Sequence, residues 1–136
     1  MLFLPHNAEV RHTVKAIIEK TIREEGQTLL GWREVPRDSR VLGFIAAEGE
    51  PVIEQVFIGK GPNIADTDAF ERELFVIRKL INKGVQQLDH ETKKQYYVPS
   101  MSARTIVYKA LTLATTLDLY YEDLATDTYA SAIALV

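Results

Sequence analysis

The sequence contains no cysteine, which excludes disulfides, thiolate metal sites and a cysteine nucleophile within these 136 residues. The absence fits a reducing compartment, because small domains in oxidising compartments usually carry disulfides. No uninterrupted apolar run approaches the ~20 residues that a membrane-spanning helix needs. The apolar start at residues 1–5 is too short for a signal sequence and has no basic region. We therefore expect a cytoplasmic protein without a membrane partner.

The sequence also lacks an excess of positive charge. It has 16 basic and 19 acidic residues, a formal net charge of -3, and so has no electrostatic footprint for nucleic acid. Hydrophobic residues make up 46% and charged residues 26%, which is ordinary for a globular chain and argues against disorder. The length suits a single domain.

The usual spacings of metal-binding and phosphate-binding residues are missing. His6, His12 and His90 do not have zinc-ligand spacing, so we interpret them as surface residues. The short run at residues 59–61, Gly-Lys-Gly, lacks the spacing of a phosphate-binding loop, which favours a plain turn.

The candidate nucleophiles and the acidic residues also lack the motifs that usually surround such sites. Ser100 and Ser102 are not part of a GxSxG elbow. Arg104 could bind a carboxylate near Ser102, although an arginine in a hairpin is more often solvated or cross-strand. An acidic group near a helix end lacks the spacing of a calcium loop, and we interpret it as a solvated face; it consists of Glu122, Asp123 and Asp127. The residues alone therefore predict no catalytic, cofactor-binding or metal-binding site.

Five tyrosines invite comparison with base-stacking proteins. No basic groove accompanies them in the sequence, so packing in the core and sheet is the favoured interpretation. They are Tyr96, Tyr97, Tyr108, Tyr120 and Tyr121.

Two segments have the apolar period of a helix. The first covers about residues 8–25, with Asn7 as N-cap and Gly26 as the left-handed residue that ends it. The second covers about residues 69–87, with Asp68 and Glu71 as a capping box. Shorter helices are expected after residues 37–39 and 115–116, and residues 86–95 are expected to be a solvated connection.

Strands are expected where β-branched and aromatic residues gather between turn residues. Two such strands cover residues 28–35 and 52–58. Residues 96–101 and 104–109 should form a further pair, with an edge or bulge at Pro99, which has no N–H to donate. The fold class that follows is α+β, with two long helices packed on a small, mostly antiparallel sheet.

The C-terminal run at residues 132–136 is apolar without a break, whereas natural chains usually end in polar, mobile residues. The run has the composition of a buried strand. Either the terminus is pinned in a sheet or the segment is cut from a longer protein, and we favour the second interpretation. Exposed sheet edges and apolar patches would favour self-association of the isolated segment.

Several stretches, in order along the chain, resemble the class-II glutamine amidotransferase (glutaminase) domain of the glutamate synthase large subunit. Two of them are residues 30–36 and 102–109, and the most specific parts of these are Gly-Trp-Arg-x-Val-Pro at residues 31–36 and Arg-Thr-Ile-Val-Tyr-Lys at residues 104–109. The other similar stretches are residues 1–5, 50–58, 69–79 and 131–136.

The resemblance implies an N-terminal-nucleophile (Ntn) hydrolase fold. In that family an N-terminal cysteine attacks the side-chain amide of glutamine, with its own α-amino group as base. The ammonia reaches a second site, where it joins 2-oxoglutarate and is reduced to glutamate with FMN and an iron–sulfur cluster. The resemblance therefore implies a framework segment, residues 1–136, whose partner is the remainder of the large subunit.

The sequence departs from the family at the positions that carry catalysis. It has no cysteine for the nucleophile, and it stops before the family's His-x-Arg-Phe-Ser-Thr-Asn-Thr segment and its Asn-Gly pair. Ala110 stands where the family usually has glycine. No family catalytic residue can be assigned, so we expect the isolated chain to be inactive, with its FMN and iron–sulfur cluster elsewhere in the parent enzyme.

Two alternatives remain open. The chain could be a stand-alone binding or regulatory module of amidotransferase-like shape. It could also be an independent hydrolase that uses Ser100 or Ser102, which a serine-directed covalent probe would label.

Overall fold

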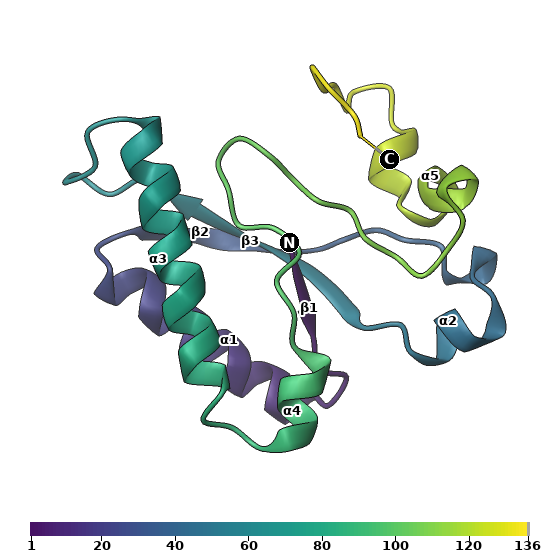
Figure 1. Ribbon diagram of the computed structural model, residues 1–136, viewed down its shortest axis with the longest axis horizontal. Coiled ribbons are helices and arrows are strands. Elements are labelled where there is room, and N and C mark those ends of the chain that lie inside the picture. The colour runs from purple at the N-terminus through teal and green to yellow at the C-terminus, as the bar shows by residue number, and fades with distance from the viewer. Residues whose placement is uncertain (136) are drawn as a thin grey trace. The chain divides into compact units, whose positions relative to one another are not determined.

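The computed structural model describes residues 1–135 and divides them into two compact units. The first unit comprises Met1–Arg33 and Pro51–Val107, and the second comprises Glu34–Glu50 and the chain from Tyr108 onwards. Figure 1 shows the elements along the chain. Within residues 1–135, no helix has both the length and the apolar character to cross a membrane.

Helix α1, Ala8–Glu24, has the predicted caps. Asn7 Oδ1 accepts hydrogen bonds from the backbone N–H groups of Glu9 and Val10, at 3.0 and 3.1 Å. At the other end, the φ of +71° at Gly26 allows the Gln27 N–H to bond the carbonyl of Ile22, at 3.0 Å. That bond closes a Schellman motif.

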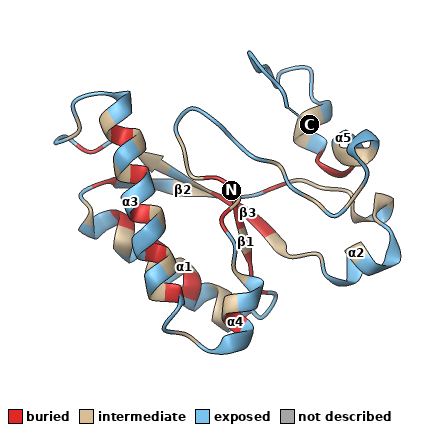
Figure 2. Ribbon diagram, in the orientation of Figure 1, coloured by how far each residue is buried: buried red, intermediate tan, exposed pale blue. Residues whose placement is uncertain are grey.

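Helix α3, Thr67–Val85, begins slightly earlier than predicted. Its N-cap is Asp66, whose carboxylate accepts the N–H of Ala69 at 2.7 Å, so the assignment of Asp68 as cap was wrong. The Glu71 carboxylate does not complete a capping box, because it bonds residues 102–103 instead. Five residues of the predicted apolar stripe are buried in α3, where Figure 2 shows buried positions in red: Phe70, Leu74, Ile77, Ile81 and Val85. The sixth residue of the predicted stripe, Leu88, lies after the end of the helix and is half-buried.

The sheet has three strands in the order β1-β3-β2. They are β1 (Leu2–Leu4), β2 (Thr28–Glu34) and β3 (Val52–Gly59), and β1 pairs antiparallel with β3 in the register Phe3↔Ile53. The α+β class with a small antiparallel sheet is therefore confirmed. Helix α1 has 17 residues and α3 has 19. The two helices and β1 share one core, which comprises Leu2, Leu4, Val14, Ile18, Ile22, Ile77, Ile81, Val85 and Val98.

The predicted strands at residues 96–101 and 104–109 are wrong. Only Tyr97 pairs, in an isolated bridge to Phe3, with N···O distances of 2.8 and 3.1 Å. Serine hydroxyls take the neighbouring backbone donors: Ser100 Oγ accepts the N–H of Val107, and Ser102 Oγ accepts the N–H groups of residues 104 and 105. These local bonds compete with a strand ladder, so the segment is irregular.

Two further predictions need correction. Residues 86–95 are not wholly a connection, since they contain α4 (His90–Gln95), which Asp89 caps through the N–H of Thr92 at 3.0 Å. Residues 132–135 are exposed and not a strand, because no described strand pairs with them. The last residue of that predicted strand, Val136, lies outside the described residues.

The second unit contains only short helical elements. A single turn of 3-10 helix, Ser39–Val41, precedes α2 (Phe44–Glu48), so the one short helix that the sequence predicts after residues 37–39 is split in two. The helix predicted after residues 115–116 is α5 (Leu117–Tyr120), which 3-10 turns flank at Ala114–Thr116 and Glu122–Ala125.

Candidate functional site

A polar network centred on Glu50 links three parts of the second unit. Arg37 Nε donates to Glu50 Oε1 at 2.8 Å, and the Tyr120 hydroxyl donates to the same oxygen at 2.7 Å. Ser39 Oγ lies 2.7 Å from Glu50 Oε2 and donates to the carboxylate. Both members of the Arg37–Glu50 ion pair are largely buried, with 16% and 14% of their side chains exposed. Charge-assisted bonds in such surroundings are stronger than those between exposed groups.

The backbone around the network positions these side chains. Arg37 and Tyr121 form an antiparallel bridge, and the N–H of Asp38 donates to the carbonyl of Tyr120 at 2.8 Å. The Asp38 carboxylate then caps the following turn through the N–H of Arg40, at 3.0 Å. The segment after Pro36 is thereby held beside α5.

The network favours ionised Glu50. Burial raises the pKa of the Glu50 carboxyl, but the hydrogen bonds from Tyr120, Ser39 and Arg37 outweigh burial and leave its pKa below the ordinary value. Burial and the bond to Glu50 raise the pKa of the Tyr120 hydroxyl. An ionised carboxylate that already accepts three donors is a poor general base, so the network is a structural ion-pair cluster.

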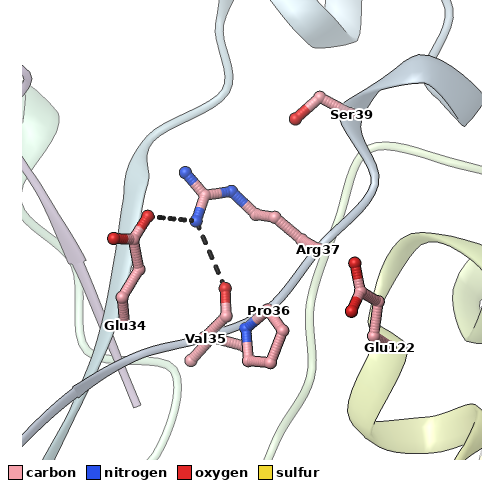
Figure 3. Close-up of a pocket in the computed structure, with 6 residues that line it drawn as sticks. All are labelled: Glu34, Val35, Pro36, Arg37, Ser39 and Glu122. Atoms are coloured by element: carbon pink, nitrogen blue, oxygen red, sulfur yellow. Dashed lines mark hydrogen bonds and ion pairs between the residues drawn. The ribbon is translucent and has the colours of Figure 1, made fainter.

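Beside the network lies a pocket of about 420 Å³. Figure 3 shows Arg37 Nη1 donating to Glu34 Oε1 and to the carbonyl of Val35, both at 3.3 Å. The lining residues are Glu34, Val35, Pro36, Arg37, Ser39 and Glu122. Its charged groups are one guanidinium and two carboxylates, which suits binding of a small polar molecule and supplies no activated nucleophile.

The tyrosines serve packing, as the sequence predicted for them. Tyr121 lies edge-on to Tyr108 and to Tyr120, with ring centroids 4.9 and 4.6 Å apart. Its hydroxyl donates to the carbonyl of Lys109 at 2.7 Å, and burial raises its pKa to about 12. Elsewhere, Tyr97 lies 5.9 Å from Phe3, ring to ring. The hydroxyl of Tyr96, the last of the five tyrosines considered from the sequence, is buried in the first unit and has no hydrogen-bond partner among residues 1–135.

The serines and the arginine considered from the sequence, Ser100, Ser102 and Arg104, hold a loop of the first unit in place through hydrogen bonds and an ion pair. Ser102 Oγ donates to Glu71 Oε2 at 2.8 Å, and Arg104 pairs with Asp68 at the start of α3. Ser100 is buried, and its hydroxyl accepts the N–H of Val107 at 3.0 Å. The bonds tie this loop to the first turn of α3 and bring no histidine base to either serine.

The run at residues 59–61 begins with the last residue of β3, Gly59, and leads into a loop whose turn lies at residues 62–63, slightly later than predicted. The N–H of Gly61 donates to Gln27 Oε1 at 2.8 Å. A Cβ on Gly61 would lie 2.1 Å from the carbonyl oxygen of Gly26, so only glycine fits there. Lys60 lies in this loop, and its Nζ reaches the carbonyl of Ala65 at 3.5 Å.

The histidines and the acidic group do not gather. His6, His12 and His90 are all exposed and belong to the first unit. Asp123 accepts the hydroxyl of Tyr108 at 3.0 Å, Glu122 lines the pocket and Asp127 is exposed. Within residues 1–135, no three or more His, Asp or Glu side chains are placed to hold a metal ion.

Reasoning from the sequence missed the Glu50 network. Glu50 and Tyr120 are 70 positions apart, and no motif spacing joins them. The only sequence signals are the proline and the polar cluster at residues 36–39, which indicate a turn and say nothing of its partners.

The chain matches a known family over its whole length. The family model described as glutamine amidotransferases class-II covers residues 1–136. The large chain of NADPH glutamate synthase from Bacillus subtilis (strain 168) is 39% identical over 138 aligned positions, which cover 100% of this chain and 9% of that protein. The chloroplastic ferredoxin-dependent glutamate synthase 2 of Arabidopsis thaliana is 37% identical, with 99% and 8% covered.

A third relative, ferredoxin-dependent glutamate synthase 2 of Synechocystis sp., is 37% identical, and the match covers 99% of this chain and 8% of that protein. The chain thus spans less than a tenth of the length of the relatives it matches. The family model covers every residue, and the relatives exceed 30% identity over almost the whole chain. This chain belongs to the class-II glutamine amidotransferase family.

Proposed function

We propose that this chain is a framework portion of the glutaminase domain of a glutamate synthase large chain. One observation carries the proposal: the whole chain matches the class-II amidotransferase family, and the same residues match a small part of large chains named as glutamate synthases. The proposed parent hydrolyses glutamine and transfers the ammonia to 2-oxoglutarate, forming glutamate.

The proposed contribution of this chain is scaffolding. Helices α1 and α3 pack on the strands through a shared apolar core. Hydrogen bonds anchor the loop after Ser100 to α3, and the Glu50 network anchors the turn before α2. Rigid elements of this kind hold catalytic side chains to within fractions of an ångström. We propose a partial N-terminal-nucleophile hydrolase fold whose reacting residues other parts of the polypeptide supply.

The surface of the chain supports a partner. Large apolar side chains are exposed on both units; those more than 70% exposed are Phe44, Ile45, Leu111, Leu113, Ile133 and Leu135. In the described sheet, β1 and β2 are the outer strands, and the bridge from Phe3 to Tyr97 covers part of the outer side of β1. Exposed edges and apolar groups of this kind are usually covered in the native assembly. The proposed partner is the remainder of the large chain.

The cofactors belong to the same proposal. An iron–sulfur cluster is held by cysteine thiolates, and this chain has none to offer. We therefore propose that the cluster of the parent lies outside these residues. We propose the same for its FMN, and a cytoplasmic location for the parent enzyme. The isolated chain is then not catalytic.

The experiment is to sequence the native gene on both sides of this segment and to assay its product. The proposal expects a frame that runs upstream to a cysteine start and downstream into His-x-Arg-Phe-Ser-Thr-Asn-Thr. It also expects the purified product to form glutamate from 2-oxoglutarate only when glutamine is present. A frame that closes at both ends of these 136 residues would overturn the proposal and leave a stand-alone binding module.

A further inference from the structure

The outer face of α3 combines basic and large apolar side chains. Opposite the buried stripe, Arg72, Val76, Lys79 and Lys83 follow one another at spacings of 4, 3 and 4, which places them on one line of the helix. Two large side chains flank this line: Phe75 is 59% exposed and Leu80 is 37% exposed. Val76 on the line is 41% exposed. We call these six residues the α3 outer surface.

The α3 outer surface carries positive charge on a chain whose net charge is negative. Between residues 72 and 83 the only carboxylate is Glu73, which lies off the line. The pKa of Glu73 is raised, mainly by burial and further by the negative charge of the nearby Glu25. Lys79 Nζ lies 5.2 Å from the centre of the Phe75 ring, a cation–π contact within the surface itself. Three cations therefore surround the exposed apolar groups. The carboxylate that continues the line, Asp68 four residues before Arg72, already pairs with Arg104.

The outer face of α1 shows what a solvated helix looks like in the same unit. Its charges have both signs and pair along the helix: Lys20 lies 3.7 Å from Glu24, and Arg23 lies 3.6 Å from Glu19. Among the described residues of α1, no large apolar side chain is exposed. A helix of this unit can therefore pack on the core and still have an outer face without exposed large apolar side chains. The basic and apolar residues of the α3 outer surface need another explanation.

We propose that the α3 outer surface docks against an apolar surface rimmed with carboxylates, located elsewhere in the same longer polypeptide. This inference rests on the proposed function. The chain covers only 9% and 8% of its relatives, so most of such a polypeptide lies beyond this segment. Burial would remove Phe75, Val76 and Leu80 from water, and carboxylates would neutralise the three cations.

A second copy of this chain is a poor occupant of the surface. In a twofold dimer the same patch meets itself, so the basic line of one copy would face the basic line of the other. Like charges facing each other across an interface disfavour association. A carboxylate-rimmed surface on a different part of the polypeptide has no such conflict.

Site-specific photo-crosslinking in the native full-length polypeptide tests the proposal. The photoreactive residue p-benzoylphenylalanine replaces Val76, and a matched control places it at Ala16, which is exposed on the outer face of α1. The expected result is a crosslink from position 76, mapped by mass spectrometry to a segment outside these 136 residues that is rich in Asp, Glu and apolar residues, and no such crosslink from position 16. A crosslink within these residues, between two copies or to another protein, or none at all, would overturn it.

Charge variants sharpen the test. The double variant Lys79→Glu with Lys83→Glu should reduce the crosslink yield by roughly tenfold or more, because the proposed carboxylates would face new carboxylates. Lys79→Arg with Lys83→Arg should retain the yield. Both pairs lie on the surface, and far-ultraviolet circular dichroism verifies their folding. An unchanged yield in the Glu variant would contradict the inference.

Ammonia release from glutamine, measured on the same samples, separates the two proposals. A polypeptide that crosslinks as expected and does not hydrolyse glutamine would contradict the proposed function and support the docking surface. A polypeptide that hydrolyses glutamine and gives no crosslink at position 76 would support the proposed function and contradict the docking surface.

Discussion

At the scale of single residues, Glu50 is the group whose loss should disturb the second unit most. Its carboxylate accepts bonds from Arg37, Ser39 and Tyr120, which come from two segments far apart in sequence. Removing the charge would leave the largely buried Arg37 guanidinium with the exposed carboxylate of Glu34, at 3.3 Å, as its counter-ion. Breaking a buried ion pair by removing one partner is costly, and more so than the pair itself is worth.

Glu50→Gln should therefore lower the stability of the second unit by about 1–3 kcal/mol. Native-state hydrogen exchange of residues 36–41 and 117–121 measures the loss, because these amides belong to the segments that Glu50 joins. Glu48→Gln is the matched control, since Glu48 is exposed on α2, and it should change exchange by less than about 0.5 kcal/mol. Equal effects of the two substitutions would contradict the role of Glu50.

The same unit should respond to pH at both extremes. The folded pKa of Glu50 lies below its ordinary value of 4.5, so its contribution is present above that pH and is lost as pH falls through the folded pKa. Burial raises the pKa of Tyr121 from 10.0 to about 12, so its contribution is present below pH 10 and is lost as pH rises through 12. Hydrogen-exchange protection, corrected for intrinsic rates, should be level between about pH 5 and 9. Protection that stayed unchanged down to pH 3 would contradict the predicted loss of the Glu50 contribution at low pH.

At the scale of secondary-structure elements, the N-cap of α3 differs from the one predicted from the sequence, because Asp66 caps the helix in place of Asp68. Asp66→Ala should cost about 1 kcal/mol, because it removes the acceptor of the Ala69 N–H. Asp68→Ala should cost less, since it removes an exposed ion pair with Arg104 and an exposed charge in the first turn of α3. Chemical denaturation of both variants measures the difference. A larger loss for Asp68→Ala would restore the original assignment.

The long helices could be predicted because local information determines them. The stripe of Val14, Ile18 and Ile22 has helical period, and the caps Asn7 and Gly26 lie at its two ends. The strand at residues 52–58 could be predicted from its β-branched run in the same way, and β3 extends it by one residue.

The elements that failed depend on partners that local pattern does not reveal. The segments around residues 96–109 have strand composition, yet the hydroxyls of Ser100 and Ser102 capture the N–H groups that a ladder needs. Helix α4 is too short to display a period, and its one signal is the cap at Asp89. The Glu50 network joins residues 70 positions apart, which a single sequence cannot pair.

At the scale of the whole molecule, the amount of exposed apolar surface favours a partner surface that is not part of this chain. The first unit has a well-formed core, whereas exposed apolar groups in the second unit include Phe44, which is 84% exposed, and Leu111, which is 73% exposed. Groups of this size normally find a partner surface.

The isolated chain should consequently self-associate as its concentration rises. Size-exclusion chromatography with light scattering should give a mass that increases above 15.4 kDa with loading. Strictly monomeric elution at the highest concentration would mean that these surfaces tolerate water, and would count against an incomplete domain.

The central claim is that this chain is framework and that catalysis needs residues that it does not contain. Ammonia release from glutamine, measured on the purified 136-residue chain and on the native polypeptide in parallel, tests it most directly. The account predicts no release above the uncatalysed background by the chain alone, and sustained release by the native polypeptide. Glutamine turnover that follows the isolated chain through every purification step would contradict the account, because a chain without cysteine would then hold a complete active site.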